Sequence, residues 1–428
     1  MFERPVIDPR CVLVSLDIGI RDPAVHLEFE DLACSAGAQI VARVGGQRVT
    51  PEPKYFVGTG KAEEVRAKVQ ETGAGLVLVN HPLSPSQERN LEALIQCRVL
   101  DRTGLILDIF AQRARSFEGK LQVELAQLRH LATRLVRGWS HLERQKGGIG
   151  LRGPGETQLE SDRRLLRARV AQLERRLLRV GRQRSQGRAL RQRSAVPTVA
   201  LVGYTNAGKS TLFNAMTGAQ GYAADQLFAT LDPTARQLDL GTLRVVVVDT
   251  VGFVRDLPHE LVAAFRATLE ETRQADLLLQ VIDASDDEAD SQQIAVNEVL
   301  DQIGAGEIPR LCVFNKIDLA GWPNAMREDA AGRIVQVDVS AHTSAGLDGL
   351  RTAIRRHFQG VSHRHWLRLD HAEGGTRARL YAAGAVCDER VDESGWLLEV
   401  DAPPARLAEL VQKPVDDMGL VAPAAGHP

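Results

Sequence analysis

Apolar residues follow two different spacings along the first quarter of the chain. Short apolar runs, typical of buried strands, alternate with segments whose apolar positions recur every three or four residues, as in amphipathic helices. The strand-like runs lie at residues 12–14 and 75–79, and the helical segments at residues 29–36, 61–71 and 86–95. This alternation predicts a small α/β domain with a partly parallel sheet over residues 1–115.

The next region has a longer pattern, in which apolar residues are spaced four and three apart. One such seam is formed by Leu121, Leu125, Leu128, Ala132 and Leu135, and a second by Leu159, Leu166, Val170, Leu173, Leu177 and Val180. Helices with such seams bury them against each other, so we expect an antiparallel helical hairpin over residues 116–194. A glycine-rich loop, residues 147–156, would form its tip. Two interpretations stay open: a probe that approaches a neighbouring surface, with charge from Arg144, Lys146 and Arg152, or a plain coiled-coil spacer.

The remaining residues predict two further domains. Strand-like runs at residues 199–202, 243–248, 275–281, 311–314 and 334–339 alternate with helical segments, as in a doubly wound parallel sheet, over residues 195–358. The tail, residues 359–428, offers strands at 366–369, 379–381 and 396–400 and a short helix at 407–412. The predicted fold class is therefore a multidomain α/β protein with a helical hairpin and a small α+β appendage.

Composition indicates where positive charge gathers along the chain and in which cellular compartment the protein works. The net charge of −2 hides a basic segment: residues 161–194 contain twelve arginines and only two acidic residues, Asp162 and Glu174. That segment is either a solvated helix face or a contact for nucleic-acid phosphates, and the scarcity of acidic partners favours the second. The five cysteines are scattered, and no secretion signal or run of ~20 apolar residues is present. We expect a cytoplasmic monomer, with contact to a membrane surface left open.

Residues 203–210, Gly-Tyr-Thr-Asn-Ala-Gly-Lys-Ser, carry the clearest chemistry. They follow the strand-like run at 199–202 and open into a predicted helix, the context in which a glycine loop binds phosphates. Backbone N–H groups from Asn206 to Lys209 would surround the β-phosphate, and Lys209 would reach the β and γ oxygens. The motif predicts a binding site for a nucleoside triphosphate.

A metal ion and a mobile loop are expected beside this motif. The Ser210 hydroxyl and the Asp249 carboxylate, at the end of the strand at 243–248, would bind Mg²⁺, and the Gly252 N–H would meet the γ-phosphate. Thr230 is the preferred second hydroxyl on the metal, and Thr234 is the alternative, because spacing alone does not separate them. We therefore expect Ser210, Thr230 and Asp249 at the metal, and Lys209, Thr230 and Gly252 as the catalytic groups.

A second motif names the base. Asp318, in Asn315-Lys316-Ile317-Asp318, would accept two hydrogen bonds from guanine, whereas adenine lacks that pair of donors. Asn315 would contact the other side of the ring, Lys316 would lie over its plane, and Ser340-Ala341-His342 would offer backbone N–H groups to the guanine carbonyl. The expected nucleotide contacts are Gly203, Tyr204, Thr205, Asn206, Ala207, Gly208, Lys209, Ser210, Thr211, Phe228, Ala229, Thr230, Leu231, Asp232, Asp249, Thr250, Val251, Gly252, Asn315, Lys316, Ile317, Asp318, Ser340, Ala341 and His342.

Taken in order, these motifs resemble the five signatures of translation-factor-related GTPases. A narrower resemblance rests on residues 147–160, 228–234 and 249–253, with the leading α/β domain and the hairpin, and it points to the HflX family of ribosome-associated GTPases. It covers about residues 10–360. The resemblance implies GTP as substrate, binding to the large ribosomal subunit and its RNA, splitting or rescue of stalled ribosomes, and approach of the N-terminal region to the peptidyl transferase centre.

Two positions raise further questions. Many small GTPases carry a water-orienting glutamine after the glycine at position 252, whereas this chain has Phe253. Slow intrinsic hydrolysis is expected, with a partner supplying or repositioning the missing group. Arg255 and His259 are nearby candidates to replace it, and Phe253 can also simply pack beneath a switch helix.

A second glycine motif lies in the first domain. Gly58-Thr59-Gly60-Lys61 is either a glycine turn or part of an ATP site.

Two functions from different classes fit the sequence. The first is a GTP-driven ribosome remodeller, and the second is a GTP-controlled switch acting on a protein or membrane partner. An RNA partner predicts a steep loss of affinity with salt, and a protein partner predicts a shallow one. A GTP-using metabolic enzyme is disfavoured, because the sequence offers no catalytic constellation outside the nucleotide site.

Overall fold

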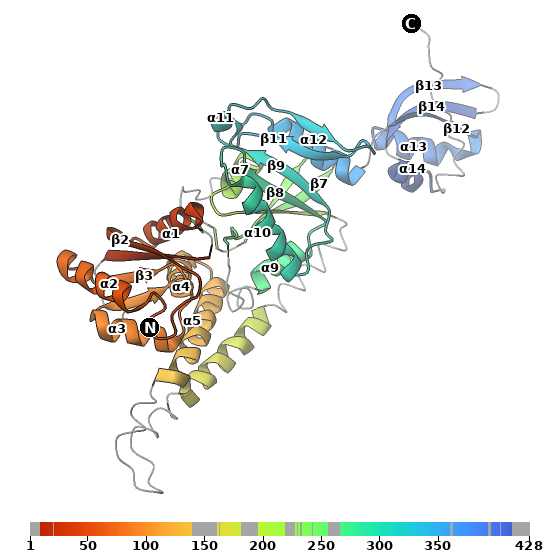
Figure 1. Cartoon of the computed structure of the whole chain (residues 1–428). Helices are drawn as coiled ribbons and strands as arrows, with labels where there is room; N and C mark the ends of the chain where they lie inside the picture. The colour runs from red at the N-terminus through yellow and green to blue at the C-terminus, as the bar shows by residue number, and fades with distance from the viewer. Residues whose placement is uncertain are drawn as a thin grey trace.

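The computed structural model describes residues 9–19, 21–138, 161, 163–180, 196–218, 227–228, 230–231, 233–241, 243–255, 266–359, 363–392, 395–402 and 404–412. These residues form three sheets with their own helices, and a pair of long helices beside the first sheet (Figure 1). The expected multidomain α/β class is confirmed. Within these ranges, no helix combines the length and apolar character needed to cross a membrane.

The N-terminal domain is a parallel four-stranded sheet with helices on both faces. Its elements are β1 (Arg10–Ile18), α1 (Pro23–Ser35), β2 (Gln39–Arg48), α2 (Thr59–Thr72), β3 (Leu76–Val79), α3 (Pro85–Ile95), β4 (Arg98–Asp101) and α4 (Arg102–Arg113), with strand order β2-β1-β3-β4. Alternate residues of β1 point to opposite faces. Cys11 and Leu13 pack with α1 and α4, and Val12 and Val14 pack with α2 and α3. Parallel sheets are covered in this way because each crossover helix lies on a face.

The helical hairpin begins with α5 (Phe117–Gly138), and its second helix covers residues 163–180. Leu121 and Leu125 pack against the fully buried Leu173, with Leu128, Val170 and Leu177 beside them, so the two leucine seams meet as predicted. Two ion pairs cross the seam, Arg129 with Glu174 at 2.7 Å and Arg169 with Glu124 at 2.6 Å. The tip loop, including Arg144, Lys146 and Arg152, lies outside the described residues.

The central domain holds a seven-stranded sheet in the order β10-β11-β9-β8-β5-β7-β6. Its strands are β5 (Thr198–Gly203), β6 (Thr234–Asp239), β7 (Arg244–Asp249), β8 (Leu277–Asp283), β9 (Arg310–Asn315), β10 (Met326–Glu328) and β11 (Ile334–Asp338), and its helices are α7 (Lys209–Thr217), α9 (Arg266–Arg273), α10 (Ala289–Gln302), α11 (Ile317–Ala320) and α12 (Leu347–Gln359). The edge strands β6 and β10 run antiparallel to their neighbours, and the inner strands are parallel. The carboxyl ends of β5, β7 and β9 therefore lie along one edge, where the predicted nucleotide motifs follow.

The C-terminal domain is a small antiparallel sheet covered by helices. It contains β12 (His363–Leu369), the 3₁₀ turn η1 (His371–Glu373), α13 (Gly374–Ala382), β13 (Val386–Asp392), β14 (Gly395–Ala402) and α14 (Pro404–Val411), with strand order β12-β14-β13. The expected strand at residues 379–381 is wrong, because these residues belong to α13. Thr376 and Leu380, four residues apart, are buried on one face of that helix, a spacing that a three-residue window cannot reveal.

Candidate functional site

The phosphate loop turns sharply between β5 and α7. Asn206 (φ 61°) and Gly208 (φ 88°) both adopt left-handed backbone conformations, and α7 begins at Lys209. A Cβ on residue 208 would lie 2.2 Å from Nδ2 of Asn315, so only glycine fits there. The turn presents the start of α7 at the edge of the sheet, and helix starts attract anions through their free N–H groups.

Lys209 is buried under this loop. Its Nζ donates a hydrogen bond of 2.5 Å to the carbonyl oxygen of Tyr204. Burial lowers the pKa of Lys209 to about 8, and the nearby Asp249 carboxylate only partly opposes the shift. The ammonium group is therefore under-compensated, and anionic phosphate oxygens would stabilise its charge.

Three oxygen-bearing side chains converge beside Lys209. The Ser210 Oγ lies 2.6 Å from Oγ1 of Thr230, and it donates a hydrogen bond of 2.7 Å to Oδ2 of Asp249. The other carboxylate oxygen of Asp249 is buried with no hydrogen-bond partner, and burial raises the pKa of this carboxyl group despite the two hydroxyls. Hard oxygen donors around an orphaned carboxylate oxygen suit Mg²⁺, so these residues fit the expected metal.

The two threonines considered for the metal have different environments in the structure. Thr234 is exposed at the start of β6, whereas Thr230 is part-buried and contacts Ser210. Between Thr230 and Thr234, Asp232 lies outside the described residues, as does Ala229 on the other side of Thr230.

Gly252 lies against the phosphate loop and Phe253 anchors it there. A Cβ at residue 252 would lie 2.9 Å from Cγ2 of Thr205 and 3.0 Å from Nζ of Lys209, so a side chain would crowd the place where a γ-phosphate is expected. The backbone of Phe253 pairs with the loop: its N–H donates to Gly203 O at 3.1 Å, and its carbonyl accepts from Thr205 N–H at 2.8 Å. The ring is fully buried in an apolar cluster, which favours the packing interpretation of Phe253.

The base-side motifs are held together by Asn315. Its Nδ2 donates to the carbonyl of Ala207 at 2.9 Å, and its Oδ1 accepts from the N–H of Ala341 at 2.9 Å. Both ends of the buried amide bond to the protein, so Asn315 braces the phosphate loop against residues 340–341. Since Nδ2 carries a second N–H, the contact of Asn315 with the guanine ring stays a prediction. Lys316 pairs with Asp283 at 2.7 Å. Asp318 is exposed in α11, and its role toward guanine stays a prediction.

Sequence patterns gave no sign of a polar network that joins this site to the N-terminal domain. The Tyr204 hydroxyl donates to Glu28 of α1 and accepts from the N–H of Arg255 at 3.0 Å. Arg102, almost fully buried, donates both to Glu28 and to the carbonyl oxygen of Arg255 at 3.1 Å. Residues in contact here are 51 to 176 positions apart, so no local motif could have predicted them.

Arg255 has a different environment from the one expected of a catalytic substitute. Its guanidinium pairs with Asp22 at 2.9 Å and with Glu288 at 3.0 Å, and it donates to Ser291 at 2.7 Å. A pocket of about 260 Å³ lies beside it, between α1 and Tyr204-Thr205-Asn206. The other candidate, His259, lies outside the described residues.

The early glycine motif also has a defined setting. Gly58 (φ 91°) precedes α2, with the guanidinium of Arg48 packed where a side chain would be. Lys61 pairs with Glu64 at 2.7 Å. These contacts favour the interpretation of residues 58–61 as a glycine turn that starts a helix.

Three features together define a P-loop GTPase. The phosphate loop follows the central parallel strand β5, a carboxylate ends the neighbouring strand β7, and an Asn-Lys-x-Asp motif begins at the end of β9. Comparisons with known proteins agree. Residues 25–111 match a model described as the N-terminal region of a GTP-binding GTPase, residues 113–191 its middle region, and residues 198–316 a model described as a 50S ribosome-binding GTPase.

The chain belongs to the HflX family of GTPases. It is 60% identical over 398 residues to GTPase HflX of Escherichia coli (strain K12), which covers 92% of this chain and 93% of that protein. GTPase HflX of Magnetococcus marinus is 45% identical, covering 90% and 89%. A crystal structure of a GTP-binding protein from Sulfolobus solfataricus in complex with GDP is 22% identical, with a TM-score of 0.42, covering 81% of this chain and 97% of that one. The chain is thus a GTP-hydrolysing enzyme.

Proposed function

We propose that the site binds GTP with Mg²⁺ through the residues described above. Ser210, Thr230 and Asp249 would hold the metal ion, whose charge offsets that of the β- and γ-phosphates. Lys209 would add a second positive charge, and Gly252 leaves space for the γ-phosphate. Asp318 would select guanine. The orphaned buried oxygen of Asp249, next to two hydroxyls, is the observation that supports the metal.

We further propose that the GTP-bound protein binds the large ribosomal subunit in the cytoplasm and splits or rescues stalled ribosomes. The observation that carries this proposal is the arginine face of the hairpin, Arg164, Arg167, Arg176 and Arg179, which are all exposed on the helix at 163–180. Glu174 on the same helix is paired with Arg129 of α5, so it does not neutralise that face. Exposed guanidinium groups along one rigid helix suit an array of RNA phosphates.

Co-sedimentation with purified large subunits tests this function. The full chain, with Mg²⁺ and a non-hydrolysable GTP analogue, should pellet with large subunits and should do so less with GDP. Each neutralised phosphate should add close to one unit to the slope of log affinity against log salt concentration, so about four contacts give a steep loss.

Two charge-reversed variants provide the test and its matched control. Arg164→Glu with Arg167→Glu should abolish most pelleting. Arg355→Glu with Arg356→Glu on α12 changes the net charge equally and should leave pelleting intact. Equal losses in both variants would show that net charge alone matters. A shallow salt slope with intact binding would favour a protein-directed switch instead, and binding to anionic vesicles in place of subunits would indicate a membrane partner.

A further inference from the structure

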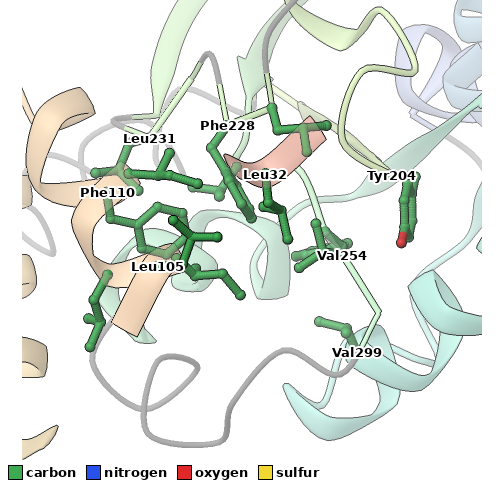
Figure 2. Close-up of a cluster of buried hydrophobic side chains, with 14 of the residues drawn as sticks. Leu32, Leu105, Phe110, Tyr204, Phe228, Leu231, Val254 and Val299 are labelled. Atoms are coloured by element: carbon green, nitrogen blue, oxygen red, sulfur yellow. The ribbon is translucent and has the colours of Figure 1, made fainter. Parts of the chain in front are cut away.

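The loop that carries Thr230 is fixed to the N-terminal domain by apolar contacts. Phe228 and Leu231, on either side of Thr230, are each only 2% exposed. The ring of Phe228 meets the ring of Phe110, from α4, edge to face, with 4.6 Å between the centroids and 85° between the planes. Figure 2 shows both rings in one cluster with Leu32 and Leu105 of the N-terminal domain. The partners of this loop thus come from α1 and α4 of another domain.

The loop backbone is held in an unfavourable conformation at this contact. Phe228 has φ 55°, a left-handed value that is strained for a bulky residue. Such a conformation persists only where surrounding contacts determine it. Beside it, the N–H of Leu227 donates to Oγ of Ser35 at 3.2 Å, which adds a polar contact from the end of α1.

Thr230 lies between these anchors in the sequence, and its Oγ1 lies 2.6 Å from Oγ of Ser210. We propose that the N-terminal domain clamps this loop, so that Phe110 acts as a positioning residue that keeps Thr230 at the metal. The inference rests on the proposed Mg²⁺–GTP site and is independent of the ribosomal role.

The clamp extends to the other two loops of the site. Glu28 accepts from the Tyr204 hydroxyl in the phosphate loop, and Arg102 bonds the carbonyl of Arg255, three residues after Gly252. Arg255 also pairs with Asp22, which caps the start of α1. All three segments that would surround a γ-phosphate therefore contact the same two helices, α1 and α4, and their first residues.

The consequence is a coupling between domain docking and the nucleotide. A triphosphate with Mg²⁺ needs Thr230 in place, whereas GDP does not need this hydroxyl. A ligand that binds the docked form better must in turn stabilise docking, because coupling between two sites is reciprocal. The N-terminal domain would therefore raise the preference for GTP over GDP.

Nucleotide affinity of the full-length Phe110→Ala variant tests the clamp. With Mg²⁺, its affinity for a non-hydrolysable GTP analogue should fall about five- to tenfold, as typical coupling energies imply. Its affinity for GDP should stay within about twofold. Phe110→Leu should restore part of the loss, and Ser35→Ala should lower analogue affinity by a smaller factor in the same direction.

Leu91→Ala is the matched control, since Leu91 is equally buried in the cluster on the opposite face of the same sheet. It should destabilise the N-terminal domain without changing the ratio of analogue to GDP affinity. The clamp is overturned if Phe110→Ala leaves this ratio unchanged, or if Leu91→Ala alters it as much. If the unaltered chain shows no Mg²⁺-dependent affinity for the analogue, the proposed nucleotide site fails instead, so the two failures are distinguishable.

Discussion

Lys209 is the residue at which protonation and nucleotide binding should be linked. Its pKa is lowered to about 8 by burial, and bound phosphates should raise it again. Below pH 8 both forms carry the proton and affinity is full. Above pH 8 the free protein has lost a proton that the complex must regain, so affinity should fall by about tenfold per pH unit until the pKa of the complex is passed. Titration calorimetry from pH 7 to pH 10, in buffers of different ionisation enthalpy, measures the affinity and the proton uptake.

The Lys209→Met variant separates this effect from titration of the guanine itself. It keeps a side chain of similar length without a charge, so its affinity should be weak and should lack the lysine-dependent slope. If both proteins show the same pH profile, Lys209 is not the group that titrates.

Phe253 should not be a site at which hydrolysis can be restored. Its ring is fully buried in the apolar cluster shared with Val254 and Leu231, so Phe253→Gln places an amide among carbon atoms. We expect a loss of roughly 3 kcal/mol in unfolding free energy, from lost apolar burial and an unpaired polar group. GTP turnover should not rise. Denaturant unfolding and steady-state turnover measure the two effects, with Phe253→Leu as the mild control; faster turnover at unchanged stability would contradict the packing role.

How far the sequence predicts single residues depends on how local their partners are. Lys209, Ser210 and Asp249 could be proposed from local patterns, because the loop at residues 203–210 and Asp249 each come after a strand that the apolar pattern reveals. The choice between Thr230 and Thr234 needed the fold, since both positions satisfy the spacing. Glu28 and Arg102 carried no signal, because their partners lie in a different domain.

At the scale of elements, Leu173 should control the second helix of the hairpin. It is fully buried between Leu121 and Leu125, whereas α5 also packs on α3 and α4. Leu173→Ala should cost about 2–4 kcal/mol locally. Hydrogen exchange should then show faster exchange over residues 163–180 and little change in α5. Leu178→Ala, on the exposed face of the same helix, should change neither; equal loss of protection in both helices would mean that the hairpin melts as a unit.

The predictability of the elements follows their burial. Runs such as residues 199–202 and 76–79 are buried on both faces and read directly as strands. β6 went unpredicted because it is a largely exposed edge strand, and β2, also at an edge, carries mixed polar residues and two glycines. α4 was missed because residues 105–110 are apolar except for Asp108, and so short a stretch shows no period that tells a helix from a strand.

At the scale of the whole molecule, packed contacts link the hairpin to the nucleotide site through the N-terminal domain. The arginine face lies on the hairpin, whose first helix packs on the N-terminal domain, and that domain contacts the loops of the nucleotide site. Contact at the hairpin therefore has a continuous path of packed residues to Thr230. The hairpin and the nucleotide site are coupled only if binding of the large subunit to the hairpin changes the activity of the nucleotide site.

GTP turnover in the presence of large ribosomal subunits measures that effect. Phe253 supplies no group to orient the attacking water, so turnover by the free protein should be slow, and saturating large subunits should accelerate it at least about tenfold. Small subunits, offered at equal RNA mass, should give no comparable stimulation. The variant with Arg164→Glu and Arg167→Glu should keep the slow intrinsic rate and lose the stimulation, because its nucleotide site is unaltered. Equal turnover with and without large subunits would show that the phosphoryl transfer machinery is complete in this chain and that the ribosome is not its trigger.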